Sequence, residues 1–526
     1  MKIRLDTPLP PWVALVLAIP LGALTVCSFA PFGVSLIAVF ALALLFLRWA
    51  QTHSRREAFC TGYGFGLGFF LAGVSWIYVS LHTFGAMPMP LAALATLLFC
   101  AFLALFPALT GYAVACVPRS AATKLLLAAP ALWMLVEWTR GWIFTGFPWL
   151  AVGYSQIPGH PLAGYAPVLG VYGVSLALAW SAGGLALTVV WTGGMKFRHG
   201  PGSLSALRDA RSRPSVVVLA CVAALWLGGF GLRQVAWSQP TGVTTTVALL
   251  QGNVAQDMKW REDKIIATLN AYRDMVKASA AQLIVLPETA LPLFLHQAPP
   301  DYLDDLAAHA RNNKGDILIG VPERLQTGEN AGAYFNSVIS LGSAPTQHYR
   351  KSHLVPFGEF IPLRPVLGWI VGVLAIPLQD FSRGGLDQQP LTVAGQRVAV
   401  NICYEDVFGE EIIRQLPQAT MLVNASNVAW FGRSIAPQQH LQISQARALE
   451  TGRYMLRATN TGVTAVIDER GNVVKAAEEF TTSTVTHNVP GFQGTTPYVR
   501  WGNYAALLIA GLMLLGAALI GRRGPA

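Results

Sequence analysis

Eight long apolar runs, seven of them before residue 238, most strongly constrain what this chain can fold into. About 17 to 25 mainly apolar residues in a helix cross the roughly 30 Å of hydrocarbon in a bilayer. The runs lie near residues 10–28, 34–50, 60–80, 89–117, 124–140, 166–192, 215–237 and 502–521. Only 12% of the residues are charged, well below the usual quarter of a soluble protein. The sequence therefore predicts a multi-pass α-helical membrane domain of eight helices.

The first apolar run follows Lys2 and Arg4, as the core of a signal peptide does. However, six further runs follow it closely, and no A-x-A-like cleavage site stands out. We therefore interpret this run as the first membrane helix.

Loops rich in lysine and arginine alternate along the chain with loops that lack them, which predicts the orientation of the helices in the membrane. Cytoplasmic loops carry the excess of these residues. If the N-terminus is inside, the inner segments contain Arg48, Arg55, Arg56, Arg119, Lys124, Lys196, Arg198, Arg208, Arg211, Arg213, Arg522 and Arg523. The outer connections around residues 29–33 and 81–88 contain none. We thus expect seven membrane helices in residues 1–237, a domain outside the cytoplasm in 238–500, and a last helix with a cytoplasmic tail in 501–526.

The formal charge of +10 is distributed unevenly. Residues 238–500 contain 21 lysines and arginines and 23 acidic residues, a net charge of −2, so the remaining segments carry +12. A nucleic-acid-binding protein needs a basic face on a soluble domain. The basic excess here follows membrane topology instead, and we expect no nucleic-acid partner.

One cysteine stands apart from the other five. Cys27, Cys60, Cys100, Cys116 and Cys221 lie in or at the ends of apolar runs, where cysteine behaves as a small hydrophobic residue. Cys403 is the only cysteine of residues 238–500, so a disulfide within that segment is excluded. By itself, this thiol is either buried and inert or retained for its reactivity.

Residues 238–500 alternate short strands with amphipathic helices, which indicates an α/β domain with helices covering its sheets. We predict helices at 261–279 and about 437–452. We predict strands at 244–253, 281–289, 316–322, 335–341, 397–403, 420–426, 455–460 and 463–468.

The apolar segment Leu367–Leu378 does not suit a soluble domain and is too short to span a bilayer. Its prolines and glycines make a regular core helix awkward. Two interpretations remain open: a core helix, or a lid that dips into the membrane through Trp369 and Ile370.

Three polar residues, Glu288, Lys351 and Cys403, lie at strand ends or in adjoining loops, where α/β folds place their sites. A thiolate is a nucleophile, a carboxylate accepts its proton, and an ammonium group stabilises the thiolate and an oxyanion. Taken singly, each has an ordinary structural explanation: a turn acid, a surface cation and a buried thiol.

Other functional classes have weaker support. His348, His353 and His440 would allow a Cys/His protease, but no flanking sequence resembles a papain or caspase site. No histidine or carboxylate pair has metal-ligand spacing, and no cofactor is expected. A transporter would place more ionisable residues within its spans than Glu137.

Taken together, three motifs resemble those of the nitrilase or carbon–nitrogen hydrolase superfamily. They are L-P-E-T (286–289), Y-R-K-S-H-L-V-P-F-G-E-F (349–360) and N-I-C-Y-E-D (401–406), in this order. G-F-P-W-L-A-V-G-Y-S-Q (146–156), Q-G-N-V-A-Q-D-M-K-W (251–260) and N-V-A-W-F-G-R-S (427–434) further resemble the apolipoprotein N-acyltransferases of bacterial inner membranes. This resemblance covers essentially the whole chain and implies a nitrilase-like α-β-β-α sandwich in the periplasm.

The resemblance also implies a ping-pong acyl transfer. Cys403 would attack the sn-1 ester of a phospholipid of the phosphatidylethanolamine type, Glu288 would be the general base, and Lys351 would support the oxyanion. The resulting thioester would acylate the α-amine of diacylglyceryl-cysteine in an apolipoprotein, the last step of lipoprotein maturation. The implied supporting or substrate-binding residues are Glu359, Tyr404, Glu405, Trp260 and Trp430.

The sequence departs from the family pattern at one position, where Asn427-Val428 stands in place of the expected Asn-Asp. This raises the question of how that loop is hydrogen-bonded. We expect the protein to work as a monomer among membrane lipids. The competing interpretation is a membrane-anchored amidase or nitrilase that hydrolyses a small amide or nitrile.

Overall fold

The computed structural model describes residues 9–52, 54–192, 206–256, 259, 261–328, 331–362, 365 and 380–520. Trp260 and the predicted lid Leu367–Leu378, with Trp369 and Ile370, lie outside these residues. The chain forms two compact units. The helical unit comprises Met1–Ser75, Leu94–Val235 and Trp501–Ala526, and the sandwich unit comprises Trp76–Ala93 and Ala236–Arg500.

The helical unit consists of long apolar helices joined by short helical turns. Its α-helices are α1 (Pro11–Thr25), α2 (Leu36–Gln51), α3 (Arg55–Val74), α5 (Met89–Cys116), α6 (Ala121–Thr123), α7 (Ala129–Arg140), α8 (Ala166–Trp191), α9 (Ala206–Leu232) and α16 (Tyr504–Ile520), with α5 beginning in the sandwich unit. Its 3₁₀ and π turns are η1 (Val26–Ser28), η3 (Lys124–Ala128), η4 (Ile143–Thr145), η5 (Val152–Gln156) and η6 (Pro161–Tyr165).

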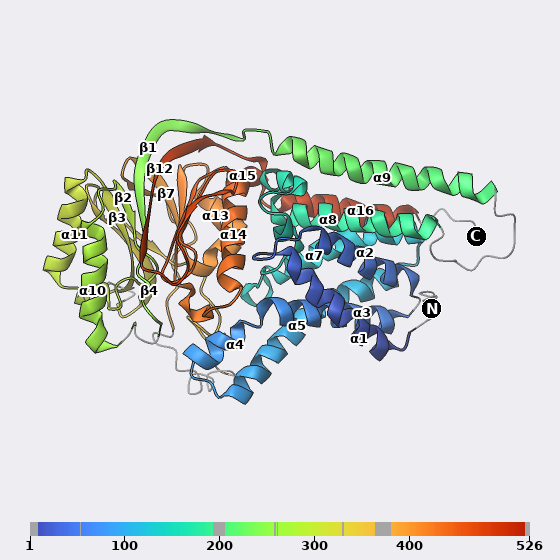
Figure 1. The fold of residues 1–526 in the computed structure, drawn as a ribbon, viewed down its shortest axis with the longest axis horizontal. Helices are drawn as coiled ribbons and strands as arrows, with labels where there is room; N and C mark the ends of the chain where they lie inside the picture. The colour runs from blue at the N-terminus through green and yellow to red at the C-terminus, as the bar shows by residue number, and fades with distance from the viewer. Residues whose placement is uncertain are drawn as a thin grey trace. The chain divides into compact units, whose positions relative to one another are not determined.

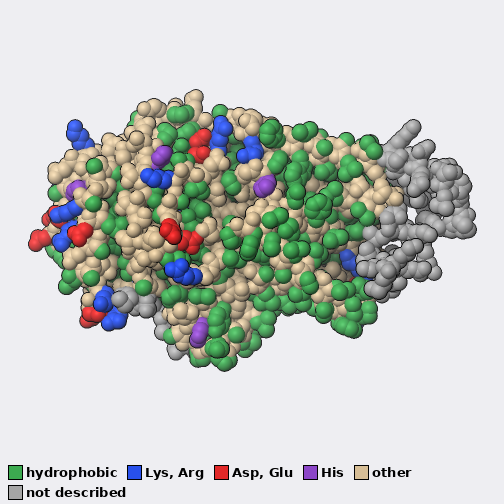
Figure 2. Space-filling view, viewed as in Figure 1, with side chains coloured by type: hydrophobic (Ala, Val, Ile, Leu, Met, Phe, Trp, Pro, Cys, Tyr) green, Lys and Arg blue, Asp and Glu red, His purple; other side chains and the backbone are tan. Residues whose placement is uncertain are grey.

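Six helices in the described part of the chain are long and apolar enough to cross a membrane. They span Pro11–Ser28, Arg55–Val74, Met89–Cys116, Ala121–Arg140, Pro161–Trp191 and Pro214–Leu232. Two shorter apolar helices, Leu36–Gln51 and Tyr504–Ile520, lie where the sequence predicts the other two spans. On the face shown in Figure 2, hydrophobic side chains gather over the helical unit, and charged side chains are sparse there. As expected of a membrane protein, apolar helices lie at the predicted places, and six of those described are long enough to cross a bilayer.

Glycines allow α1 and α3 to pack closely. A Cβ atom on Gly64 or Gly68 would come within 2.0 Å of a carbonyl oxygen of α1, and one on Gly22 within 1.9 Å of the Phe65 carbonyl oxygen. Without a hydrophobic force between helices in lipid, such close backbone approach is what holds membrane helices together. A side chain at any of these positions would force the pair apart.

The sandwich unit contains two six-stranded sheets. The first has the order β12-β1-β2-β3-β4-β5 and the second the order β11-β10-β9-β8-β7-β6. The strands are β1 (Ser238–Gln251), β2 (Leu283–Val285), β3 (Asp316–Arg324), β4 (Tyr334–Gly342), β5 (His348–Arg350), β6 (Leu391–Val393), β7 (Gln396–Ile402), β8 (Met421–Ser426), β9 (Met455–Thr459), β10 (Ala465–Ile467), β11 (Val473–Ala476) and β12 (Ser483–Gly494). The pairs β1/β2, β2/β3, β7/β8 and β8/β9 are parallel, and the other pairs are antiparallel.

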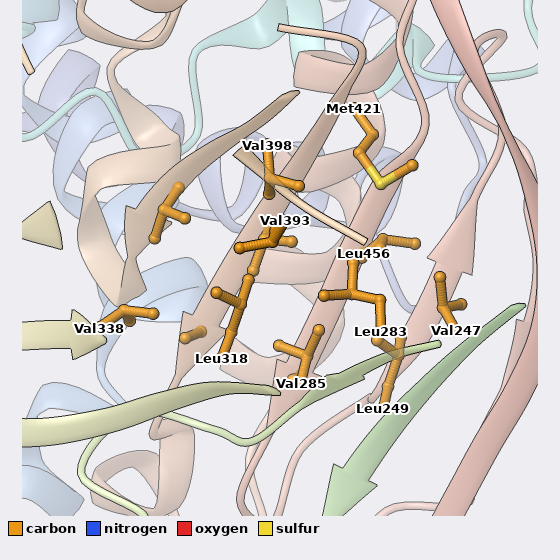
Figure 3. Packing of buried hydrophobic residues seen from close by; sticks show 14 of the residues in the cluster. Val247, Leu249, Leu283, Val285, Leu318, Val338, Val393, Val398, Met421 and Leu456 are labelled. Carbon is orange, nitrogen blue, oxygen red and sulfur yellow. The ribbon is translucent and has the colours of Figure 1, made fainter. Parts of the chain in front are cut away.

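Alternation along the strands builds the core between the sheets. Successive side chains of a strand point to opposite faces. In β1, Val247 and Leu249 join the inter-sheet cluster, whereas Ala248 and Leu250 face the covering helices. Side chains from both sheets meet in Figure 3: Val247, Leu249, Leu283, Val285, Leu318, Val338, Val393, Val398, Met421 and Leu456.

Helices cover the outer face of each sheet, which completes the four layers. On the first sheet lie α10 (Glu262–Lys277) and α11 (Pro300–Asn312), which bury Tyr272 and Leu306 against it (Figure 1). On the second lie α13 (Gly409–Ile412) and α14 (Ala436–Thr451) (Figure 1). The α-β-β-α sandwich predicted from the sequence is confirmed.

The remaining elements in the described residues of the sandwich unit are short. Its α-helices α4 (Ile77–Val79) and α15 (Pro497–Trp501) lie near its borders, with Trp501 assigned to the helical unit. The turns are η2 (Ser80–Phe84), η7 (Leu295–Gln297), η9 (Cys403–Val407), η10 (Ile413–Gln415) and η11 (Val428–Phe431).

Candidate active site

The sandwich unit brings together the three residues singled out from the sequence. Glu288 follows β2, Lys351 immediately follows β5, and Cys403 immediately follows β7. The Nζ atom of Lys351 lies 3.5 Å from Oε1 of Glu288. The charges of both residues act on the Cys403 thiol. Residues separated by more than 50 positions in sequence thus form one cluster.

Cys403 occupies a sharp turn between a strand and a helix. Its φ of 53° lies in the left-handed region, which residues other than glycine rarely adopt. It is also the first residue of η9, and its carbonyl oxygen accepts a hydrogen bond from Nδ2 of Asn424 at 3.1 Å. Backbone strain of this kind often accompanies functional sites, where it orients a side chain.

The resting thiol is protonated at neutral pH. Burial raises the pKa of Cys403 to about 12, and the Glu288 carboxylate adds to this effect, while the charge of Lys351 opposes it. A nucleophilic attack by this sulfur therefore requires a base to take the proton as the new bond forms.

Lys351 is a buried cation held by two carboxylates. Its side chain is 1% exposed, and its Nζ atom lies 2.9 Å from each oxygen of Glu359 and 3.5 Å from Glu288. Burial alone would lower the pKa of Lys351, but the charges of Glu359 and Glu288 outweigh burial and raise the pKa above its usual value. Lys351 therefore stays charged at physiological pH.

Glu288 is oriented by groups that the sequence analysis did not identify. Asn336, in β4, donates from Nδ2 to Oε1 of Glu288 at 2.7 Å and to Oε1 of Glu359 at 2.9 Å. The backbone N–H of Asn427 donates to the second oxygen of Glu288 at 2.8 Å. Asn336 is one of several polar residues of β4, and nothing in the sequence marks it as the residue that bridges two carboxylates.

Glu405 connects the turn at Cys403 to β5 and to the residues that follow this strand. One of its oxygens accepts hydrogen bonds from the N–H groups of Ser352 and His353 at 2.7 and 3.0 Å. The other accepts from the N–H of Ile402 at 2.7 Å and from the Tyr349 hydroxyl at 3.0 Å. Burial raises the pKa of this carboxyl to about 7, although Lys351 and the backbone N–H groups act in the opposite direction. Its position fits the supporting role implied by the resemblance.

Tyr404 and its aromatic neighbours lie beside this turn. The Tyr404 ring centroid is 5.2 Å from that of Phe408 and 6.0 Å from that of His353, in edge-on arrangements. The Phe408 and His353 rings are stacked at 3.7 Å. Tyr404, the residue after Cys403, is thus packed against two other rings.

A buried polar network lies behind the cysteine turn. Asp406 accepts hydrogen bonds from Ser444 at 2.5 Å and from Arg457 at 3.3 Å, and its other oxygen lies 2.6 Å from Nε2 of His440. The charges and hydrogen bonds of these partners outweigh burial and lower the pKa of Asp406. His440, like His353 beside Glu411 and His348 beside Glu323, is paired with a carboxylate.

The loop that departs from the family pattern is anchored through Asn427. Its Nδ2 donates to Oε1 of Gln256 at 2.8 Å, and its Oδ1 accepts from Asn460 at 3.2 Å. Val428 is 1% exposed and packs so closely on Gly462 that a Cβ there would lie 2.2 Å from it. Val428 thus makes an apolar contact at the position where the resemblance leads us to expect an aspartate.

The segment Trp76–Ala93 also contacts this loop. The Ser80 hydroxyl donates to the carbonyl oxygen of Trp430 at 2.7 Å, and the Trp76 indole N–H donates to Gln439 at 3.2 Å. The Trp76 ring centroid lies 4.5 Å from that of Phe431. Trp430 therefore sits in a loop that is attached to the N-terminal half of the chain.

We expect Ser80→Ala to loosen this loop without unfolding the protein. A net hydrogen bond contributes about 1 kcal/mol, so the rate of the reaction at this site should fall severalfold while the melting temperature changes by only a few degrees. Thr83→Ala, at an exposed position of the same turn, is the matched control. Unchanged activity in the Ser80 variant would show that the loop does not need this anchor.

Comparisons with known proteins agree with this architecture. The family model described as the apolipoprotein N-acyltransferase N-terminal domain matches residues 21–184, and the carbon-nitrogen hydrolase model matches residues 246–495. An apolipoprotein N-acyltransferase from Nitrosomonas europaea is 55% identical over 97% of this chain and 98% of its own length. Relatives of the same name from Chromobacterium violaceum and Methylococcus capsulatus are each 44% identical, over 96% and 95% of this chain and 93% and 95% of their own lengths.

Proposed function

This chain belongs to the apolipoprotein N-acyltransferase family, and from that premise we propose how its residues carry out the reaction. The protein is a membrane N-acyltransferase of lipoprotein maturation, with lipid and lipoprotein substrates. In our proposal Cys403, Glu288 and Lys351 perform a two-step transfer from the sn-1 ester of a phospholipid to the α-amine of diacylglyceryl-cysteine. The observation that carries it is the buried contact of Lys351 with Glu288 and Glu359 beside the strained Cys403 turn.

In the first step Glu288 takes the thiol proton while Cys403 Sγ attacks the ester carbonyl. The sulfur–carbon bond forms, negative charge develops on the carbonyl oxygen, and the ammonium group of Lys351 stabilises that charge. The carbon–oxygen ester bond then breaks. The leaving alkoxide takes the proton from Glu288 and departs as a lysophospholipid, which leaves a thioester on Cys403.

In the second step the α-amine of the acceptor attacks the thioester. The carbon–nitrogen bond forms, the carbon–sulfur bond breaks, and the amine proton returns to the sulfur through Glu288. Glu359 holds the ammonium group of Lys351. Glu405 holds the Cys403 turn against β5 and the residues that follow it. Water must be excluded from the thioester until the acceptor arrives. We propose that the segment Leu367–Leu378, with Trp369 and Ile370, excludes it. We also propose that Trp260 and Trp430 contact the substrates.

We further propose the cellular setting. Eight membrane crossings with the N-terminus inside would place the sandwich unit in the periplasm, attached to the bacterial inner membrane. There it would work as a monomer with a phosphatidylethanolamine-type donor. A diacylated apolipoprotein in the same bilayer would be the acceptor.

Product analysis tests the transfer against hydrolysis. The protein in detergent receives phosphatidylethanolamine and a synthetic diacylglyceryl-cysteine peptide, and the products are identified by mass spectrometry. We expect one acyl chain on the α-amine of the peptide for each lysophospholipid formed, and no product when that amine is acetylated beforehand. A free fatty acid without acylated peptide would instead indicate a hydrolase.

A further inference from the structure

A second lysine lies against the cluster, and the sequence motifs assign it no role. Lys259 lies between β1 and α10, and its side chain is buried, with 3% of the residue exposed. Its Nζ atom donates a hydrogen bond to the main-chain carbonyl oxygen of Glu288 at 3.1 Å. A buried ammonium group in such a place needs an explanation, because removing it from water is unfavourable unless nearby groups compensate.

The charge balance of the cluster supplies that explanation. Glu288 and Glu359 are two carboxylates, and Lys351 is bound to both of them. With Lys351 as the one cation, these three groups would carry a net charge of −1. The charge of Lys259 also acts on the Glu288 carboxylate, and on Cys403 once its thiol is ionised. A charged Lys259 brings the net charge of this cluster to zero.

Proton transfer from Cys403 to Glu288 keeps that balance. The proton moves from Sγ to a carboxylate oxygen, so the thiol becomes a thiolate while Glu288 becomes neutral. With two lysines the net charge is zero before and after the transfer. Without Lys259 the cluster carries −1 throughout, which favours protonation of Glu288 before substrate arrives and disfavours the later oxyanion.

Lys259 is also placed to respond to pH. Burial lowers the pKa of Lys259 to about 8, although the charge of Glu288, and that of Cys403 in its thiolate form, act in the opposite direction. Glu288 follows β2 and Cys403 follows β7. Lys351 contacts Glu288 and Glu359, and through Glu288 it is linked to Lys259. The ammonium form therefore prevails below about pH 8 and is lost above it.

We propose that Lys259 is a positioning residue of the acyl-transfer site, which holds the main chain of Glu288 and supplies the second positive charge that keeps the cluster neutral. This inference rests on the proposed reaction and concerns its first step. It predicts that the charge of residue 259, and not merely its size, sets the rate at which Cys403 is acylated.

The test measures a single turnover without any acceptor. Full-length protein is mixed with phosphatidylethanolamine in detergent from about pH 6 to 9, and the acyl-enzyme is counted by intact mass. Lys259→Met removes the charge, and Lys259→Arg keeps a charge that no accessible pH removes. Lys264→Met, at a lysine with a 41% exposed side chain, is the matched control.

In the wild type, the acylation rate should fall above about pH 8 as Lys259 loses its proton. The methionine variant should react about 10- to 100-fold more slowly at neutral pH, because a charged hydrogen bond is lost, and its rate should show no fall near pH 8. The arginine variant should retain its rate at high pH. The control should behave as the wild type does.

Two results would overturn the inference. One is a folded methionine variant, shown by its melting temperature, with the rate and pH profile of the wild type. The other is an arginine variant whose acylation rate falls at high pH as the wild-type rate does, or that is inactive at every pH. This second result would overturn the inference even if the methionine variant does not fold. A wild type that never acquires an acyl chain on Cys403 would instead refute the proposed reaction.

Discussion

Cys403→Ala is expected to abolish N-acylation of lipoproteins and to leave the fold intact. Alanine removes the sulfur that forms the thioester in the proposed reaction, so that reaction has no covalent route left. Loss of a nucleophile lowers turnover by at least about 10⁴-fold in other enzymes. The turn at φ 53° is made by the backbone, and alanine keeps the same Cβ atom there. Acylation is measured in membranes with a diacylated lipoprotein, and folding by thermal unfolding in detergent.

Cys221→Ala is the matched control for this experiment. Cys221 is an exposed residue of α9 in the helical unit, so its replacement tests whether loss of any thiol matters. We expect wild-type activity from it. Residual transfer of more than about one per cent in the Cys403 variant, well above the expected background, would contradict a role as nucleophile.

Glu288→Gln should reduce acylation of Cys403 by about 10²- to 10⁴-fold, the usual contribution of a general base. Glutamine has nearly the same shape, and its amide oxygen can still accept a hydrogen bond from Asn427 N–H or Asn336 Nδ2. However, it cannot take the thiol proton. Because the pKa of Cys403 is raised to about 12, almost no thiolate forms spontaneously at neutral pH.

The Glu288 variant also offers a test by pH. If the variant lacks only the base that removes the thiol proton, its single-turnover acylation rate should rise with pH, because hydroxide replaces the base. The wild-type rate should depend much less on pH in the neutral range. Glu262→Gln, at an exposed position of α10, serves as the control. Wild-type acylation by a Glu288→Gln protein would exclude this residue as the base.

Much of the fold could be predicted because its elements have strong local signals. The apolar runs predicted helices at all eight places, and continuous apolar stretches predicted β3, β4, β7 and β8. β12 (Ser483–Gly494) was not predicted, since it is largely polar and pairs with β1 through its backbone. The helix α11 was also missed, although Tyr302, Leu306 and Ala310 have helical spacing.

The site shows the same division between local and tertiary information. Cys403 is recognisable because it is the only cysteine in residues 238–500, and Glu288 and Lys351 because of their motifs. Lys259 stands in one of the quoted motifs, but its contact with Glu288, like that of Asn336, could not be predicted, because each joins residues that are distant in sequence. The contact between Ser80 and Trp430 joins positions 350 residues apart, and no periodicity encodes it.

The covalent intermediate tests the central claim most directly. Purified protein is incubated with phosphatidylethanolamine in the absence of acceptor, digested, and examined by mass spectrometry for the peptide that contains Cys403. The account predicts one acyl chain on this cysteine, which neutral hydroxylamine removes and which a diacylglyceryl-cysteine peptide takes up as an amide. Acyl transfer that proceeds while the Cys403 peptide stays unmodified would contradict the account.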